Sequence, residues 1–434
     1  MSVDAEYGPA FFPLASGRAR NGMGLRERRC HFASRRHGCK EHGAPSGTRG
    51  GACLAWMLAL WSGAASADLP ALQGSVAVET RVFAESPEDP NQARDTAAVL
   101  LNPVWKARFG SDEAWELEMS PYARIDARDK AARYVDLRVA SLEFRERSQM
   151  FRVGFDNVFW GVAESNHLVD IINQVDPRAD VELEAKLGQP MVSYTRFLDS
   201  YGRVEVFWLP YFRPRPGIGE KGRQRLEVIP ESQQTHGLGR LLRSDDWAVR
   251  WSGQIASADV GLYFFKGVGR EPDFSRSTEG DYHATRQLGM TLQLPQGSML
   301  WKLEALRRSG QGRTFNAYVA GGEYTIARPS GDLGLLLEWS QDFRDGSAPP
   351  SRFARSLFGG VRYRVSESGD GEILFGVLHD LRHNTRSYKV EFSRRLSDHV
   401  KLGLVARKFV APADSPFAAL RRDANVQMTL SWSF

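Results

Sequence analysis

The side chains best suited to catalysis lie in one segment, residues 160–189. Ser165, His167 and Asp170 supply the types needed for a nucleophile, a base and an orienting acid. On a helix, His167 and Asp170 would lie on adjacent turns, but Ser165 would point elsewhere, so a complete triad is geometrically poor. The pattern favours a hydrogen-bonded histidine in a channel constriction over a hydrolase, which stays the weaker alternative. We expect no enzyme activity.

Metal and thiol chemistry find little support in the sequence. His379 and His383 have the spacing of a metal-binding pair only on a helix, and we expect a strand end and a loop there. The cysteines Cys30, Cys39 and Cys53 all precede residue 68. The rest of the chain therefore cannot form disulfides or cysteine metal sites. We predict no metal and no cofactor.

Opposite charges offer a second kind of chemistry. Segment 160–189 is acidic, with Glu164, Asp170 and Asp176 as candidates to face basic side chains. Arginines occupy the polar face of several segments in which polar and apolar residues alternate. Those assigned to the site are Arg196, Arg203, Arg250, Arg362 and Arg364. Burying these charged side chains in a dry core would be costly, whereas a water-filled channel solvates them readily.

These residues must be positioned by β-strands, because apolar and polar residues alternate along the chain after residue 67. Residues 426–434 show the pattern without a break. Eighteen such segments can be traced, or sixteen if 134–145 and 149–159 are not a true hairpin. No apolar run after residue 67 is long enough for a membrane helix. The sequence predicts an all-β fold, a closed antiparallel transmembrane β-barrel.

The connections support a barrel independently. Short connections, such as 199–202 and 295–297, alternate with connections that are mostly long. Transmembrane barrels have short periplasmic turns and long extracellular loops, so both termini should lie in the periplasm. The longest connections are 160–189 and the basic segment 214–245. In the first, Leu168, Ile171, Ile172 and Val175 recur at helical spacing and predict a short amphipathic helix that covers the inner wall.

The amino-terminal region has the features of an export signal. A basic stretch precedes an apolar run, and Ala65-Ser66-Ala67 fits a cleavage pattern between Ala67 and Asp68. We expect residues 1–67 to be a signal peptide, with Met23 as an alternative start that would make 1–22 a mis-called extension. Nine of the 57 Lys and Arg, and four of the 52 Asp and Glu, precede residue 68, so the barrel is formally neutral. The basic isoelectric point thus gives no support for nucleic-acid binding.

Several stretches carry a resemblance to known proteins. The final strand, with Trp432 and Phe434, resembles the last strand of bacterial outer-membrane barrels, whose terminal Phe is read by the barrel-assembly machinery. Across residues 70–434 the chain resembles a family of uncharacterised, porin-like proteobacterial outer-membrane β-barrel proteins. This resemblance implies architecture and location, with no ligand or catalytic residue. The stretches that carry it are 159–161, 170–176, 207–214, 301–312 and 419–423.

The function predicted is a porin-like outer-membrane channel for passive diffusion of small hydrophilic solutes. Loop 160–189 would fold into the lumen and form the constriction. A plugged barrel with a structural or docking role is the main alternative, and an outer-membrane hydrolase is a weaker one. Expected partners are outer-membrane lipid and lipopolysaccharide, the barrel-assembly machinery during insertion, and small solutes, but no nucleic acid.

Overall fold

The computed structural model describes residues 72–179, 181–225, 241–274, 280–351, 354–365, 371–415 and 417–434. The expected signal peptide 1–67, its cleavage point at Ala67 and Asp68, and the alternative start at Met23 lie outside the described residues. The barrel prediction can be tested on the residues from 72 onward.

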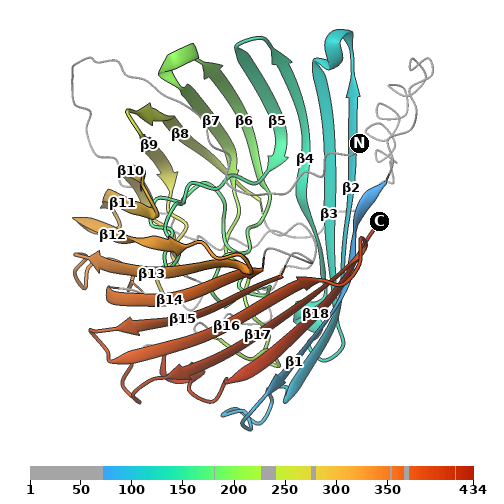
Figure 1. Ribbon diagram of the computed structural model, residues 1–434, viewed down its shortest axis with the longest axis vertical. Helices are drawn as coiled ribbons and strands as arrows, with labels where there is room; N and C mark the ends of the chain where they lie inside the picture. The colour runs from blue at the N-terminus through green and yellow to red at the C-terminus, as the bar shows by residue number, and fades with distance from the viewer. Residues whose placement is uncertain are drawn as a thin grey trace, which may run out of the picture. The chain divides into compact units, whose positions relative to one another are not determined.

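The described chain forms eighteen β-strands in one sheet (Figure 1). Their bounds are β1 Gln73–Phe83, β2 Asp95–Phe109, β3 Trp115–Asp126, β4 Tyr134–Glu146, β5 Gln149–Asp156, β6 Gln189–Phe197, β7 Arg203–Phe212, β8 Leu242–Ile255, β9 Ala258–Val268, β10 Ala284–Gln296, β11 Met299–Gly310, β12 Gly312–Ile326, β13 Gly331–Asp342, β14 Arg355–Val365, β15 Gly371–Asp380, β16 Thr385–Arg395, β17 Val400–Val410 and β18 Asn425–Ser433.

Every strand pairs antiparallel with both of its neighbours, and the first strand pairs with the last. Val78 of β1 lies opposite Leu430 of β18 on one side and Val99 of β2 on the other. The sheet therefore closes on itself and leaves no unpaired strand edge. The predicted barrel of eighteen strands is confirmed. The alternative of sixteen is wrong, because β4 and β5 do form a hairpin in which Glu146 faces Gln149.

The two faces of the wall differ as the alternation predicts. Large apolar side chains on the outward face are about half exposed, as at Val78 (48%), Leu337 (59%) and Phe375 (44%). Polar side chains on the inward face of the same strands, such as Glu79 (5%) and Glu338 (2%), are buried. The last strand follows the rule, with Val426, Met428, Leu430 and Trp432 pointing outward. An apolar outer belt around a polar interior is typical of a barrel surrounded by lipid.

The barrel has two unlike rims. At the short-turn rim the strands are joined by brief reversals such as 147–148, 256–257 and 297–298. At the long-loop rim, connections such as 157–188 and 213–241 are much longer. One connection at the long-loop rim is short: only Gln311 separates β11 from β12. Gly310 (φ 100°) and Gly312 (φ 83°) permit this tight reversal, because a glycine adopts positive φ without steric cost.

Helix is almost absent from the described residues, where only short 3-10 turns occur. No helix in the described part of the chain is long and apolar enough to cross a membrane. The amphipathic helix predicted within 160–189 does not form in the described residues 160–179 and 181–188, which contain turns, bends and an isolated bridge between Val175 and Lys186. The short turns are η1 Ser111–Glu113, η2 Lys130–Ala132, η3 Asp199–Tyr201 and η5 Ala418–Leu420.

Candidate functional site

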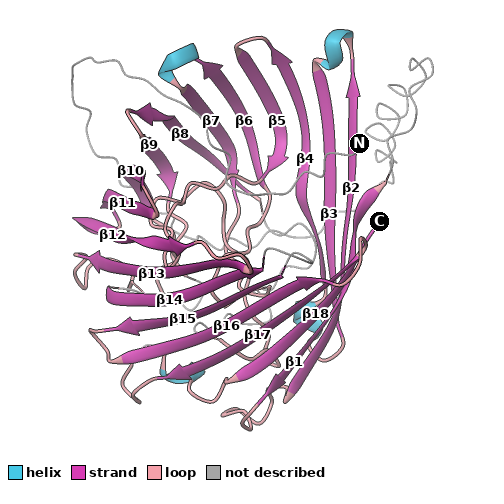
Figure 2. Cartoon of the chain, in the orientation of Figure 1, coloured by secondary structure: helices cyan, strands magenta, loops and turns pink. Residues whose placement is uncertain are grey.

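The connection between β5 and β6, residues 157–188, is folded inside the barrel; we call it the lumen loop. Its Trp160, Val169 and Ile172 are at most 1% exposed. They pack in one apolar cluster with Phe207 of β7 and Tyr263 of β9, both on the inward face. Figure 2 shows loop segments within the ring of strands. The expected contact between this loop and the inner wall is therefore present, although no helix mediates it.

Two carboxylates of the wall hold the lumen loop by its main chain. Glu304 of β11 accepts hydrogen bonds from the backbone N–H groups of Val162 (2.7 Å) and Ala163 (2.9 Å). Glu338 of β13 accepts bonds from the next two, Glu164 and Ser165, both at 2.8 Å. Four consecutive backbone donors are thus satisfied by two buried acids. Hydrogen bonds to charged acceptors are among the stronger ones in proteins.

Further wall side chains bond the loop on its other side. Gln287 of β10 donates to the carbonyl of Val169 at 3.1 Å, and Arg270 donates to the carbonyl of Ile172 at 3.0 and 3.1 Å. Gly289 of β10 makes room, since a Cβ there would lie 3.0 Å from the Val169 side chain. Buried backbone polar groups need partners, and here the wall supplies what a helix would otherwise supply internally. This explains why apolar spacing alone predicted the wrong local structure.

One asparagine fixes the base of the loop. The side chain of Asn173, which is 1% exposed, accepts a bond from the N–H of Val158. Its amide donates to the carbonyls of Asp156 and Leu187, both at 2.8 Å. Both ends of the lumen loop are thereby joined to its middle.

One of the predicted acid–arginine pairs spans the lumen loop and the wall. Glu164 lies 2.6 Å from Arg362 of β14, and Arg362 also contacts Glu323 (3.0 Å) and Glu372 (3.4 Å). Burial would raise the pKa of Glu164, but Arg362 more than offsets this and holds that pKa below its usual value. The side chains of Glu164 and Arg362 remain 24% and 16% exposed, so charge is still presented to solvent.

The other two predicted acids find partners within the loop itself. Asp170 lies 2.9 Å from Lys186, and Asp176 lies 2.8 Å from Arg178. Arg178 in turn covers the ring of Tyr134 on β4, at 3.5 Å from its centroid. Asp170 is therefore paired with a cation of the loop rather than with the expected wall arginine, whereas Asp176 has Arg138 of β4 near it in addition to Arg178.

The predicted arginines are distributed over different environments. Arg203 and Arg250 face inward and share Glu205, at 3.3 and 3.5 Å. Arg364 also faces inward, near the short-turn rim, and contacts Glu372 at 2.9 Å with 62% of its side chain exposed.

Arg196 is placed differently from the prediction. Its neighbours on β6, Met191, Ser193 and Thr195, are buried inward, so Arg196 lies on the outward face with Val192. The error arose from the register of this strand, because a shift of one residue moves a side chain to the other face.

A second loop–wall charge cluster was not assigned to the site from the sequence. Glu182 of the lumen loop lies 2.6 Å from Lys389 of β16 and 3.3 Å from Arg407 of β17. Burial would raise the pKa of Glu182, but Arg407 and Lys389 together hold it below its usual value. Next to this cluster, Val181 packs with Phe409 of β17. The lumen loop therefore reaches from the β7–β9 side of the wall to the β16–β17 side.

The side chains that suggested catalysis are drawn into separate contacts. The hydroxyl of Ser165 donates to Glu338 at 2.6 Å, and Asp170 pairs with Lys186. His167 lies 4.0 Å from Glu304 and meets the ring of Phe159 edge-on. Burial would lower the pKa of His167, but Glu304 outweighs it and raises that pKa. Ser165, His167 and Asp170 are therefore not assembled as a nucleophile, base and acid.

The other histidine pair also has separate contacts. His379 lies 3.2 Å from Asn384, and His383 lies 2.7 Å from Asp380. Within the described ranges, no group of three or more His, Cys, Asp and Glu residues is arranged to hold a metal ion.

A second segment crosses toward other strands at the long-loop rim. Residues 213–225, which we call the mouth segment, leave β7 and contact Asp136 of β4 through Arg213 at 2.9 Å. Farther along, Arg223 lies 2.6 Å from Asp423, which precedes β18. Gln224 accepts a bond from Arg81 of β1 at 2.9 Å. The interior is thus crossed by two chain segments that reach different parts of the wall.

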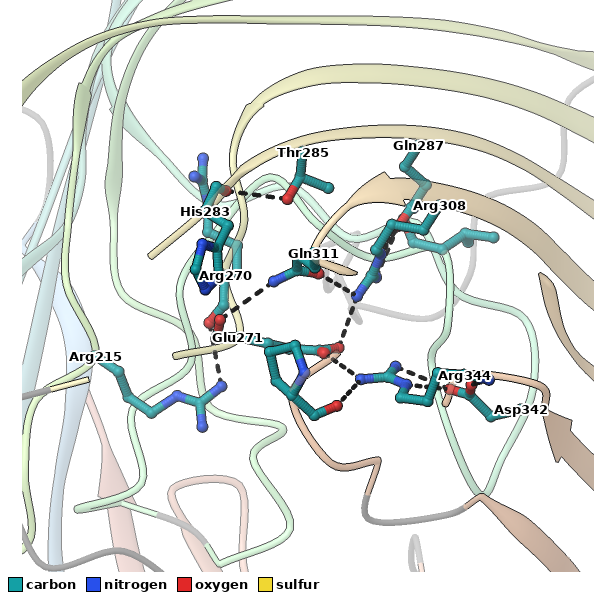
Figure 3. A network of polar contacts seen from close by, with 12 residues as sticks. Arg215, Arg270, Glu271, His283, Thr285, Gln287, Arg308, Gln311, Asp342 and Arg344 are labelled. Carbon is teal, nitrogen blue, oxygen red and sulfur yellow. Dashed lines mark hydrogen bonds and ion pairs between the residues drawn. The ribbon is translucent and has the colours of Figure 1, made fainter. Parts of the chain in front are cut away.

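Figure 3 shows a third set of contacts at the same rim. Glu271, between β9 and β10, lies 2.8 Å from Arg308 of β11 and 2.6 Å from Arg344. Arg344 also contacts Asp342 at 2.8 Å. Burial would raise the pKa of Glu271, but Arg308 and Arg344 hold it far below its usual value. This network joins the β9–β10 and β13–β14 connections to β11.

Sequence reasoning missed the residues that hold the lumen loop in place. The alternation does put Glu304 and Glu338 on the inward face. Nothing near either acid in the sequence shows that its partners are backbone amides more than a hundred residues away. The sequence offered one modest signal. Each acid lies on the polar face of its strand, and no arginine lies directly opposite it on either neighbouring strand.

Known proteins add only a general likeness. No family model and no curated protein matches the chain. Among solved structures it is similar to a mutant of the Rhodopseudomonas blastica porin, with 11% identity, 84% of this chain and 99% of that chain covered, and a TM-score of 0.42. It is also similar to OccAB4 of Acinetobacter baumannii, with 9% identity, 85% and 99% covered, and a TM-score of 0.49. Nothing about solutes transfers from likeness at this level.

Proposed function

We propose that the protein is a porin-like channel of the bacterial outer membrane through which small hydrophilic solutes diffuse passively. A closed ring of strands with an apolar outer belt suits a bilayer, because every backbone group is paired within the wall. The unlike rims support an orientation in which short turns face the periplasm and long loops face outward.

The observation that carries the proposal is the lumen loop, anchored across a charged interior. Glu304 and Glu338 fix its first half, and Glu182 with Lys389 and Arg407 fixes its second. A loop held this way would narrow the lumen. Glu164 and Arg362, both partly exposed, set opposite charges beside the solute path. The field between them would orient dipolar solutes and filter ions.

The experiment is single-channel recording with reversal potentials in a salt gradient. Wild-type protein should conduct. Arg362→Gln leaves Glu164, Glu323 and Glu372 without their shared cation, so cation selectivity should rise roughly twofold to tenfold. Glu164→Gln should shift selectivity toward anions. Arg196→Gln is the matched control, because this arginine lies on the outward face and should leave selectivity unchanged. An ion-tight barrel, or equal effects of all three substitutions, would reject the proposal.

The mouth segment favours one alternative, a plugged barrel with a structural or docking role. Its Arg213 and Arg223 are 2% and 4% exposed, so it is packed as firmly as the lumen loop. If two crossing segments together closed the lumen, wild-type protein would be ion-tight, and release of either segment would create conductance. The same recordings therefore separate the two functions. These recordings do not test the expected partners or the role of Trp432 and Phe434 in insertion, which stay predictions.

A further inference from the structure

Six basic side chains gather on the outward face of the barrel at the long-loop rim. Each belongs to a different strand between β9 and β17 and lies within three residues of that strand's end at this rim. All six are exposed. We call this set the basic rim: Lys266, Arg286, Arg307, Arg355, Arg386 and Lys408.

Their outward direction follows from the residues beside them. Phe265, Gln287, Leu306, Ser356 and Thr385 are all buried on the inward face, and each adjoins one member of the set. Since successive side chains of a strand alternate, the members project to the outside. Lys408 fits the same rule, because it lies between two buried residues of β17.

The described residues of strands β9 to β17 supply no counter-charge to this surface. Every acidic residue in the described strands β9 to β17 takes an inward position, as Glu304, Glu338 and Asp380 do. Lys266 and Arg286 even lie directly opposite each other in the β9–β10 register. Like charges at such a pair destabilise a sheet unless something else neutralises them.

The surface next to the cations is apolar. One step toward the middle of the barrel on the same face lie Phe264 (38% exposed), Leu288 (57%) and Leu357 (38%). The arrangement of a cationic band above an apolar wall matches an amphiphile with an anionic head and hydrocarbon tails. Arg355 already lies over the ring of Trp339, an aromatic residue of the outward face, at 5.5 Å from its centroid.

The basic rim occupies only part of the long-loop rim, as the strands on the other side show. At the same level, the outward positions of β1, β3, β4 and β7 hold Val82, Ile125, Val135 and Trp208. No outward Lys or Arg occurs near the long-loop ends of the described strands β1 to β7. Between the two halves, β8 holds one exposed cation, Arg243, and one exposed acid, Asp245, near its long-loop end. The other outward cations at this rim belong to the described strands β9 to β17.

We propose that the basic rim is a binding site for a phosphorylated lipid of the outer leaflet, of the chemical class to which lipopolysaccharide belongs. Four of the six residues are arginines, whose planar groups bind phosphate through paired hydrogen bonds. The acyl chains would lie along the apolar wall beneath. The site is separate from the lumen and concerns a lipid rather than the diffusing solute, and it rests on the proposed outer-membrane location.

The test is native mass spectrometry of the detergent-solubilised barrel titrated with lipid A, with dephosphorylated lipid A and with inorganic phosphate. Wild-type protein should retain phosphorylated lipid A selectively, and less of it at high salt. Replacing Lys266, Arg286 and Arg307 by Gln should weaken retention by about tenfold or more. The control replaces Arg196 and Arg394, outward cations at the short-turn rim, and should have no effect.

Fold and function are monitored separately from lipid binding. The heat-modifiable gel shift reports an intact barrel in every variant, and single-channel conductance should be unchanged, because no member of the basic rim faces the lumen. Equal retention of dephosphorylated lipid A would overturn the proposal, as would equal loss in the control variant. Competition by millimolar inorganic phosphate would show a simple anion site instead and would also overturn it. A non-conducting barrel that still binds lipid A would reject the channel and leave this site standing.

Discussion

The lumen loop and the mouth segment both cross the barrel, but they are held in opposite ways. In the lumen loop, side chains of the wall bond the loop's backbone, as when Glu304 accepts from Val162 and Ala163. In the mouth segment, side chains of the segment itself reach acids elsewhere, as when Arg223 meets Asp423. The first half of the lumen loop is thus held mainly by acids of the barrel wall, whereas the buried charge contacts of the mouth segment start from its own arginines.

This difference has consequences for stability. A loop held through its backbone depends little on its own side-chain identities at those positions, so its sequence is free to shape the passage. A segment held through its arginines should loosen around the arginine that is replaced. The two segments should therefore respond to different substitutions, and exchange of hydrogen for deuterium in each can be followed separately.

The largest effect should come from removing the wall acids that hold the lumen loop. Glu304→Gln with Glu338→Gln removes the negative charge of both acceptors and replaces one oxygen of each by an N–H2 group that faces backbone N–H groups. Since a bond to a charged acceptor contributes about 1.5–3 kcal/mol, we expect a combined loss of about 5 kcal/mol in loop docking. Amides 162–165 should exchange freely and conductance should increase.

Glu118→Gln is the matched control for this variant. Glu118 is also an inward acid, but it lies on β3 and pairs with Lys106 at 3.2 Å. It should leave exchange in the lumen loop unchanged. If the double variant protects amides 162–165 as well as wild-type protein does, the wall acids do not hold the loop.

The same contrast explains which parts of the structure were predictable. Strand number and wall faces follow from alternation, because a strand that faces lipid on one side must repeat every second residue. The basic character of 214–245 was visible in its own residues, and the side chains of Arg215, Arg223 and Arg225 make contacts there. The anchoring of 157–188 was not visible, because it depends on contacts with strands far away in the sequence. Arg196 was misplaced for a local reason, the register of one strand.

A substantial but smaller effect is expected in the mouth segment. Arg223→Met keeps the contact with the ring of Phe83 but leaves Asp423 without its cation, and both side chains of the pair are at most 4% exposed. Loss of one partner of a buried pair costs about 3–5 kcal/mol. Amides 221–225 should exchange faster, while amides 162–165 stay protected.

Arg421→Met tests whether burial is the reason. Arg421 lies 2.5 Å from Glu88 at the same rim, but the side chains are 40% and 50% exposed. Exposed pairs contribute about 0–1 kcal/mol, so this variant should behave almost as wild-type protein does. Equal exchange in the two variants would contradict the assignment of the mouth segment's position to its buried arginine.

The smallest effect should be the pH dependence of the lumen loop. The pKa of His167 is raised above its usual 6.5 by Glu304, so its stabilising contribution is complete below 6.5 and is lost as pH rises through the shifted value. The pKa of Glu164 is lowered from its usual 4.5, so its contribution is complete above 4.5 and is lost as pH falls through the shifted value. Docking should therefore be strongest between these limits. Because His167 is 4.0 Å from Glu304 and 27% exposed, the alkaline loss of docking stability should be slight.

Conductance measured from acid to alkaline pH should rise at both ends in wild-type protein. In His167→Gln the alkaline rise should disappear while the acid rise remains. An unchanged alkaline limb in that variant would mean that another group, outside the pair with Glu304, is responsible for it.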